Sequence, residues 1–263
     1  MLGSPPFDVG LASYEVGHVM AELILPKLPE NLQNLRKEED GIRAQSLLQI
    51  NGNASFVDHL VLVHDCLDAI HVHTITHENL DEEELVLQRL GVRLFNSGSC
   101  ALSLLLSGYY QNAALTIRDL LETGFLVDYF RTERSQVKIW RDSSDDERRK
   151  NFQPWQIRDA LDKRDGFTEK KRAEAYKLLS NYASHPTHAG FKLFSPKWMS
   201  KIGPFFDETY LKALFEELTK RLAAAADVYV RCFPSVKPNV RAAQEHFLSR
   251  LSAWSRTYLP KNQ

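Results

Sequence analysis

Residues 176–188, YKLLSNYASHPTH, gather hydroxyl, amide and imidazole side chains around a proline. His185 and His188 are the groups in this segment that can transfer protons near neutral pH. The hydroxyl groups and the Asn181 amide can orient a histidine or a substrate phosphate. Pro186 is expected to end or bend the helix that carries them. Polar residues also gather at helix ends to satisfy backbone groups, so the segment is either a site or a helix terminus.

A second polar pair lies within the most apolar stretch of the chain, residues 101–131. Arg118 and Glu122 stand one helical turn apart beside its apolar stripe, and Asp119 and Asp128 belong to the same stretch. Opposite charges four residues apart on a helix attract each other, so we expect an Arg118–Glu122 ion pair. Such a pair often has a structural role, and acids in clefts also act in catalysis. The pair is therefore either architecture or part of a site.

Two sets of histidines have spacings that can bind a metal. His64, Asp68 and His71 follow at intervals of four and three residues and share one helix face, and His73 with His77 repeats the pattern on another face. The HExxH motif is absent, and no second half of a ligand set can be identified. Helix-surface or partner-capped histidines are the alternative. We predict no metal and no cofactor, and the His64 stripe remains the place to look for one.

The order of three segments resembles a known group of proteins. The run LLLSGYYQNAALTIRDLLETGFLVDYF, a charged segment with a tryptophan, and YKLLSNYASHPTH follow one another within roughly residues 85–230. In this order they resemble a family of bacterial helical proteins of unknown function related to the HEPN superfamily. Members of that superfamily are helical bundles, often dimeric, and include ribonuclease toxins and phage-defence proteins. The resemblance implies a HEPN-like core, RNA as a partner and a homo-oligomer.

The ribonuclease signature of that superfamily is an arginine and a histidine with four to six residues between them. Before His185, the corresponding positions hold leucine, leucine and serine, so the arginine is absent there. Arg118, on another helix, is the candidate that can supply the missing cation in space. The implied site has His185 as general base or acid, Arg118 or His188 stabilising phosphate charge, and Glu122 and Asn181 in the same cleft.

The sequence thus predicts a HEPN-like protein that binds or cleaves RNA in stress response or phage defence. The alternative is a non-catalytic scaffold or partner-binding protein in which the same residues are structural. A meeting of Arg118 with the segment from Asn181 to His188 favours the first function. A broad exposed apolar patch without a polar cleft favours the second.

The elements that must position these residues are helices. Apolar residues recur with helical spacing along most of the chain, and no segment alternates with the period of a strand. We expect an all-α bundle of about seven to nine helices, with a break near Gly108 and an N-cap at Ser55. Residues 1–53 are expected to form an N-terminal arm or helical extension, with a short helix over 11–25. Residues 54–263 are expected to form the bundle.

The composition is that of a folded domain, with 43% hydrophobic and 25% charged residues and a net charge of −1. Because the net charge is small, contact with nucleic acid requires a local basic patch. Three widely spaced cysteines without a CxxC motif predict free thiols in a reducing compartment. The sequence shows neither a secretory signal nor an apolar run of about 18 residues. We expect a cytoplasmic protein that does not enter the membrane.

Overall fold

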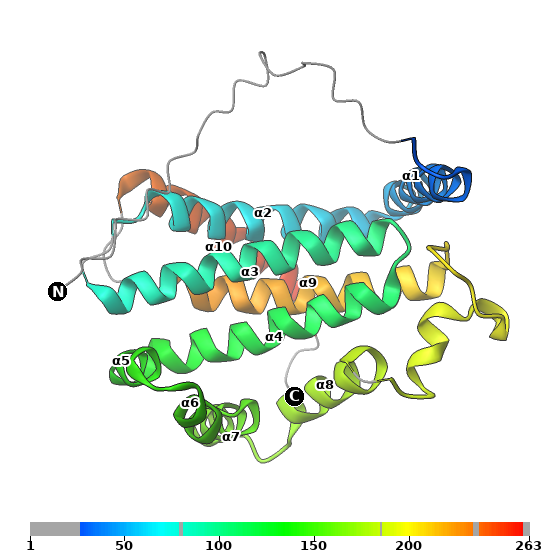
Figure 1. Cartoon of the computed structure of the whole chain (residues 1–263). Helices are drawn as coiled ribbons and strands as arrows, with labels where there is room; N and C mark the ends of the chain where they lie inside the picture. The colour runs from blue at the N-terminus through cyan, green and yellow to red at the C-terminus, as the bar shows by residue number, and fades with distance from the viewer. Residues whose placement is uncertain (1–26, 79–80, 185, 234–236, 260–263) are drawn as a thin grey trace.

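A computed structural model describes residues 27–78, 81–184, 186–233 and 237–259 (Figure 1). Over these ranges the chain forms ten α-helices and no strand, which confirms the predicted all-α class. In chain order they are α1 (Glu30–Asn51), α2 (Ala54–Thr76), α3 (Glu82–Leu106), α4 (Tyr110–Thr132), α5 (Ser135–Asp142), α6 (Asp145–Asn151), α7 (Pro154–Asp165), α8 (Lys171–Leu179), α9 (Glu208–Val230) and α10 (Pro238–Tyr258). A π-helical turn (Ser180–Ser184) and two 3₁₀ turns (Gly190–Phe194 and Pro196–Trp198) lie between α8 and α9.

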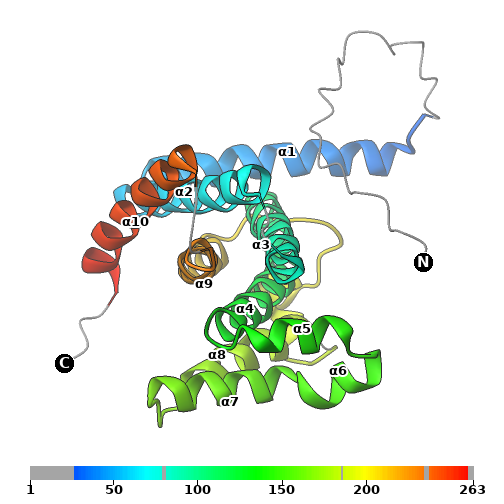
Figure 2. The same ribbon diagram turned by 90° about the vertical axis from the view of Figure 1, so that its left-hand side faces the viewer.

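The centre of the bundle consists of α2, α3, α4 and α9 (Figures 1 and 2). Helix α4 packs against both α3 and α9, and α10 packs along α2. The α4 residues Ile117 and Leu120 and the α9 residues Leu218 and Leu222 are fully buried in this core. Helices α5, α7 and α8 contact α4 away from that core. Helix α4 is thus the element that the central helices and the α5–α8 layer share.

The predicted break near Gly108 is confirmed. Helix α3 ends at Leu106, α4 begins at Tyr110, and Gly108 has a φ of +81° in the left-handed region. A Cβ atom at this position would lie 2.4 Å from the carbonyl oxygen of Phe205. Glycine is therefore required here both by conformation and by space.

The cap of α2 and the number of helices differ from the sequence predictions. Asn53, not Ser55, is the N-cap, because its Oδ1 accepts from the backbone N–H groups of Ser55 (3.0 Å) and Phe56 (3.4 Å). The estimate of seven to nine helices was too low, because the charged segment after α4 forms α5 and α6. Helix α6 buries no residue and has a capping box between Ser144 and Glu147. Acidic residues in its first turn and basic residues in its last also stabilise it locally.

Helix α1 joins the residues before position 53 to the bundle. It contacts α2 and α3, and Arg43 donates a hydrogen bond to the Ser107 hydroxyl at 2.7 Å. At the same end of the bundle, the Tyr109 hydroxyl donates to Glu39 at 2.5 Å. The division of the chain at residue 53 stays a prediction, and the short helix predicted over 11–25 lies outside the described residues.

The structure also bears on the predictions about the cysteines and the membrane. Cys66, Cys100 and Cys232 are free thiols, as predicted, and only Cys100 is exposed. In the part of the chain that the structure describes, no helix is both long and apolar enough to cross a membrane.

Candidate functional site

The predicted Arg118–Glu122 ion pair is present on α4. An Nη2 hydrogen of Arg118 is donated to Glu122 Oε1 at 3.1 Å, and the two side chains are 20% and 26% exposed. Asp119 and Asp128 do not join this pair. Asp119 accepts from Arg93 and Ser97 of α3, and Asp128 accepts from Arg164 and Arg131. The pair is therefore half-buried, and water or a ligand can reach it.

Arg118 also contacts the polar segment that follows it by about sixty residues. Its Nε donates to Ser180 Oγ at 2.9 Å, and its Nη2 donates to the Tyr176 hydroxyl. The Arg118 Cζ atom lies 4.6 Å from the centroid of the Tyr176 ring. The two polar regions singled out in the sequence thus meet in space. His185 lies outside the described residues, so its distance from Arg118 stays a prediction.

The geometry of α8 explains this meeting. Tyr176 and Ser180 are four residues apart and therefore lie on one face, which packs against α4. Leu179 and Ala183 repeat that interval and are buried. The last turn, Ser180–Ser184, is π-helical, a widened geometry that often occurs at functional sites. The segment consequently presents its hydroxyl groups to α4 instead of forming an ordinary helix end.

A second guanidinium, which the sequence analysis missed, lies on the same tyrosine. Arg158 of α7 is only 8% exposed, and its Cζ is 4.2 Å from the Tyr176 ring centroid. Its Nε and Nη1 atoms are buried without a hydrogen-bond partner among the described residues. Burial of an unpaired charge is costly, and a cation–π contact offsets only about 2 kcal/mol of that cost. Spacing gave a signal, because Arg158 lies between the buried positions Ile157 and Leu161.

Two hollows adjoin the cluster on α3 and α4. The first is shallow, and its charged lining is Arg89, Arg93, Arg118 and Asp119. The second, of about 270 Å³, is lined on its polar side by Arg93, Asp119, Glu122 and Thr123 and on its apolar side mainly by Trp140, Phe152, Pro154 and Ile157. Arg93 and Asp119 belong to both, and their ion pair stands between them. A basic surface thus continues into a hollow with aromatic walls.

The remaining predicted site residues lie in the turns after α8. Asn181 is exposed, and its backbone carbonyl accepts from the Thr187 hydroxyl. His188 is exposed, with its ring centroid 5.8 Å from that of Phe191. Both the π-helical turn and the first 3₁₀ turn contact α4. The turn that carries Asn181 is therefore held on the same helix as Arg118.

The histidines of α2 are arranged differently from a metal site. His64 and Asp68 are exposed, and His71 lies against Phe95 at a centroid distance of 5.6 Å. His73 and His77 are buried, and His77 Nε2 pairs with Glu84 at 2.9 Å. Within the described ranges, no group of three or more His, Cys, Asp or Glu side chains could hold a metal ion.

No family model, curated protein or solved structure matches this chain. The relationship to the HEPN superfamily stays a prediction from the sequence pattern. Functional assignment accordingly depends on the geometry described above.

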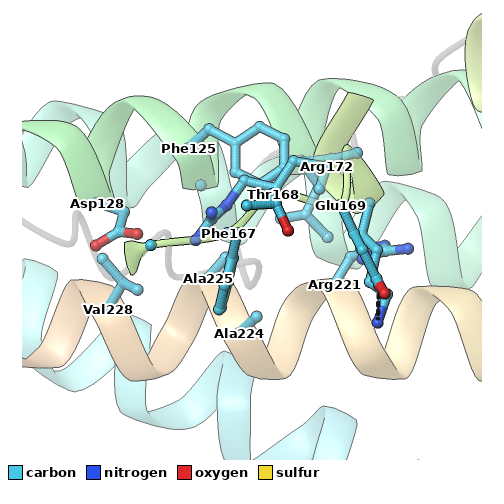
Figure 3. A pocket seen from close by; sticks show the side chains of 15 residues that line it. Phe125, Asp128, Phe167, Thr168, Glu169, Arg172, Arg221, Ala224, Ala225 and Val228 are labelled. Carbon is cyan, nitrogen blue, oxygen red and sulfur yellow. Dashed lines mark ion pairs between the residues drawn. The ribbon is translucent and has the colours of Figure 1, made fainter. Parts of the chain in front are cut away.

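A cavity between α4 and α9 was also missed by the sequence analysis. It encloses about 550 Å³ between α4 and α9, and residues 166–172 close it in front (Figure 3). Small residues offered a signal, since Gly124 and the alanine run 223–226 belong to the facing helices. Sequence alone does not show that these residues face each other.

Proposed function

We propose that this protein binds single-stranded RNA across α3 and α4 and cleaves it at the cluster around Arg118. The observation that carries the proposal is the hydrogen bond from Arg118 Nε to Ser180 Oγ. It joins a guanidinium held by Glu122 to the segment that contains His185 and His188. In this proposal His185 and His188, which can transfer protons, lie beside this fixed cation, an arrangement that suits the cleavage of a phosphodiester.

The shallow hollow supplies the contacts that RNA phosphates need. Three arginines and one carboxylate line it, so its lining is positive although the whole chain is nearly neutral. Arg89 is exposed and has no hydrogen-bond or ion-pair partner among the described residues. Arginine binds phosphate through paired N–H groups. The adjoining hollow offers Trp140 and Phe152, on which an unpaired base can stack.

The chemistry follows from RNA itself. The 2′-hydroxyl oxygen attacks the adjacent phosphorus while the P–O5′ bond breaks, which leaves a 2′,3′-cyclic phosphate and a 5′-hydroxyl. One group takes the proton of the attacking hydroxyl and another gives a proton to the leaving oxygen. We assign these roles to His185 and His188, and we assign Arg118 to the negative charge on the phosphoryl oxygens. Glu122 and Asn181 are assigned to position these groups.

The first test is binding of a fluorescein-labelled single-stranded RNA, measured by anisotropy over a series of salt concentrations. Arg118→Ala is expected to weaken binding about tenfold or more, which corresponds to one lost charge-assisted contact of about 1.5–3 kcal/mol. Arg89→Ala is expected to lower the slope of log affinity against log salt by about 0.7, the value for one phosphate on a single strand. Arg241→Ala, an exposed arginine of α10, is the matched control and should bind like the parent.

Cleavage is followed on a gel with the same RNA. His188→Ala and His185→Ala should lower the rate by about 10²–10⁴, the usual contribution of a general acid or base, without a change in affinity. The proposed binding face is wrong if the RNA affinity is the same for Arg118→Ala, Arg89→Ala and the control Arg241→Ala. If the parent protein binds the RNA but does not cleave it, the catalytic assignment is wrong and the protein is an RNA-binding protein.

One observation favours the alternative of a partner-binding protein. Helix α1 exposes Leu32, Leu47 and Leu48, and the preceding Leu28 is exposed as well. Light scattering of the purified chain distinguishes a self-associating protein from a monomer. Self-association that Leu48→Glu abolishes, together with no affinity for RNA, would favour this function over the first.

A further inference from the structure

The α4–α9 cavity has the volume and lining of a small-molecule site. Its volume of about 550 Å³ falls within the roughly 300–1,000 Å³ typical of ligand pockets. Leu120, Leu121 and Phe125 of α4 and Val228 of α9 give it apolar walls. These residues lie away from Arg118 around α4, although Phe125 also borders the smaller hollow beside Glu122. The cavity thus shares only Phe125 with the two hollows of the proposed RNA site.

Small side chains leave this space open. A Cβ atom on Gly124 would lie 3.1 Å from the Cβ of Ala225, so the two helices are close at this point. Beside that contact, Ala224 is exposed and lines the cavity without filling it. The small side chains of Gly124, Ala224 and Ala225 therefore leave the space beside this contact unfilled.

The front of the cavity carries an exposed aromatic ring. Phe167 is 58% exposed, follows Gly166 with its left-handed φ of +69°, and lies under the Arg172 guanidinium at 5.1 Å. Figure 3 shows Phe167 and Thr168 across the mouth of the cavity, between α4 and α9. A ligand with an apolar body would cover this ring, and the loss of exposed apolar surface favours binding.

The two ends of the cavity differ in their spare hydrogen-bonding groups. Asp128 lies at one end in Figure 3, and both of its oxygens accept from Arg164 at 2.9 Å. Arg221 lies at the other end, near Glu169, which forms an ion pair with Lys171 at 2.6 Å. Arg221 uses Nε and Nη2 on a single oxygen of Glu217, so its Nη1 has no partner among the described residues. Spare N–H donors at this end fit an acidic head group.

From this lining we propose that the cavity binds a small amphipathic molecule with an apolar, ring-containing body and one anionic head. The body lies between α4 and α9 beneath Phe167, and the head accepts from Nη1 of Arg221, next to the Lys171–Glu169 ion pair. Nothing in this proposal depends on RNA, so the two sites can succeed or fail independently.

The experiment uses the full chain and two dyes with the same ring skeleton. 8-Anilinonaphthalene-1-sulfonate carries one anionic group, and N-phenyl-1-naphthylamine is its neutral counterpart. Fluorescence titration should give one saturable site for the anionic dye, with weaker affinity for the neutral one. Ala224→Phe, which fills the cavity from an exposed position, should lower the affinity for the anionic dye at least tenfold. Ala213→Phe, also exposed on α9 and three turns away on the same face, is the matched control.

A second variant tests the head group. Arg221→Gln should lower the affinity for the anionic dye and leave the affinity for the neutral dye unchanged. Equal effects of Ala224→Phe and Ala213→Phe, or binding without saturation, would show that the dye binds elsewhere and would overturn the site. Loss of binding in Ala224→Phe together with equal affinity for both dyes would overturn the anionic ligand class. Circular dichroism of each variant shows that the helical fold is retained.

Discussion

Two polar clusters of this bundle use similar residues in different ways. At the end of α2, the side chains of His77 and Glu84 pair at 2.9 Å and are only 5% and 3% exposed. Phe233 packs on the His77 ring with a centroid distance of 4.4 Å, and Thr74 bonds to the Tyr229 hydroxyl at 3.0 Å. We call these five residues the α2 cluster. Aromatic rings pack around it, and its His77–Glu84 hydrogen bond is almost fully buried among the described residues.

The second cluster consists of Arg118, Glu122, Arg158, Tyr176 and Ser180, and we call it the α4 cluster. Its ion pair is partly exposed, it borders two hollows, and Arg158 keeps N–H groups without a partner. The α2 cluster joins core helices, whereas the α4 cluster joins α4 to the α7–α8 layer. The comparison teaches that a polar pair is structural when its other hydrogen-bonding groups are occupied within the protein, and can serve a site when some of them are left for a ligand. Removing one partner from each cluster tests this.

Glu84→Ala should have the largest effect on stability. It leaves His77 buried without its partner and removes the nearby charge, 3.8 Å away, from Arg134. A buried polar group left without its hydrogen-bond partner costs about 1–3 kcal/mol, and urea unfolding followed by circular dichroism measures it. Glu82→Ala is the control, since Glu82 is 75% exposed and pairs with Arg141 on the surface, where about 0–1 kcal/mol is expected. Equal losses in the two variants would contradict the buried character of the α2 cluster.

Arg118→Ala should cost less stability, about 1–2 kcal/mol, because water can replace a partly exposed guanidinium at Glu122 and Ser180. The same urea experiment measures it. Its loss of RNA affinity should be the larger effect, which is the reverse of a structural role. If Arg118→Ala loses as much stability as Glu84→Ala and binds RNA like the parent, the α4 cluster has a structural role, as the α2 cluster does.

The sequence predicted those features that depend on neighbouring residues. Helical spacing gave the all-α class, the position of Gly108 gave the break before α4, and the four-residue interval gave the Arg118–Glu122 pair. These are local signals, because one helix or one turn contains all the participating residues. The capping box of Ser144 and Glu147 was equally local and was overlooked.

Features formed between distant segments were harder to predict. The question was whether Arg118 meets the segment from Asn181 to His188. The packing of α8 on α4 instead brings Arg118 to Tyr176 and Ser180, directly before that segment. Arg158 was not singled out from the sequence, since its ring contact is with Tyr176 of another helix. Prediction of the α4–α9 cavity requires the relative position of Gly124 and Ala225, which the periodicity of either helix does not give.

The smallest expected effect is a pH dependence of stability from His73, whose ring lies 6.3 Å from Tyr229 of the α2 cluster. Burial lowers the pKa of His73, while its hydrogen bond to the Ala69 carbonyl opposes this and the neighbouring His77 reinforces it. Because the folded pKa lies below the unfolded value of about 6.5, the unfolded chain binds the proton first as the pH falls. Stability from this group is therefore present above about pH 6.5 and is lost on acidification below it.

His73→Asn removes the titrating ring and keeps a polar side chain at this position. Its free energy of unfolding in urea should fall less between neutral pH and pH about 5.5 than that of the parent, because one proton-linked contribution is gone. Val72→Ala on the same helix is the control, since it removes apolar contacts without titrating and should lower stability equally at both pH values. A parent and a His73→Asn variant with identical pH profiles would mean that burial at the end of α2 does not suppress protonation of His73, and that this end of the bundle admits water as the α4 cluster does.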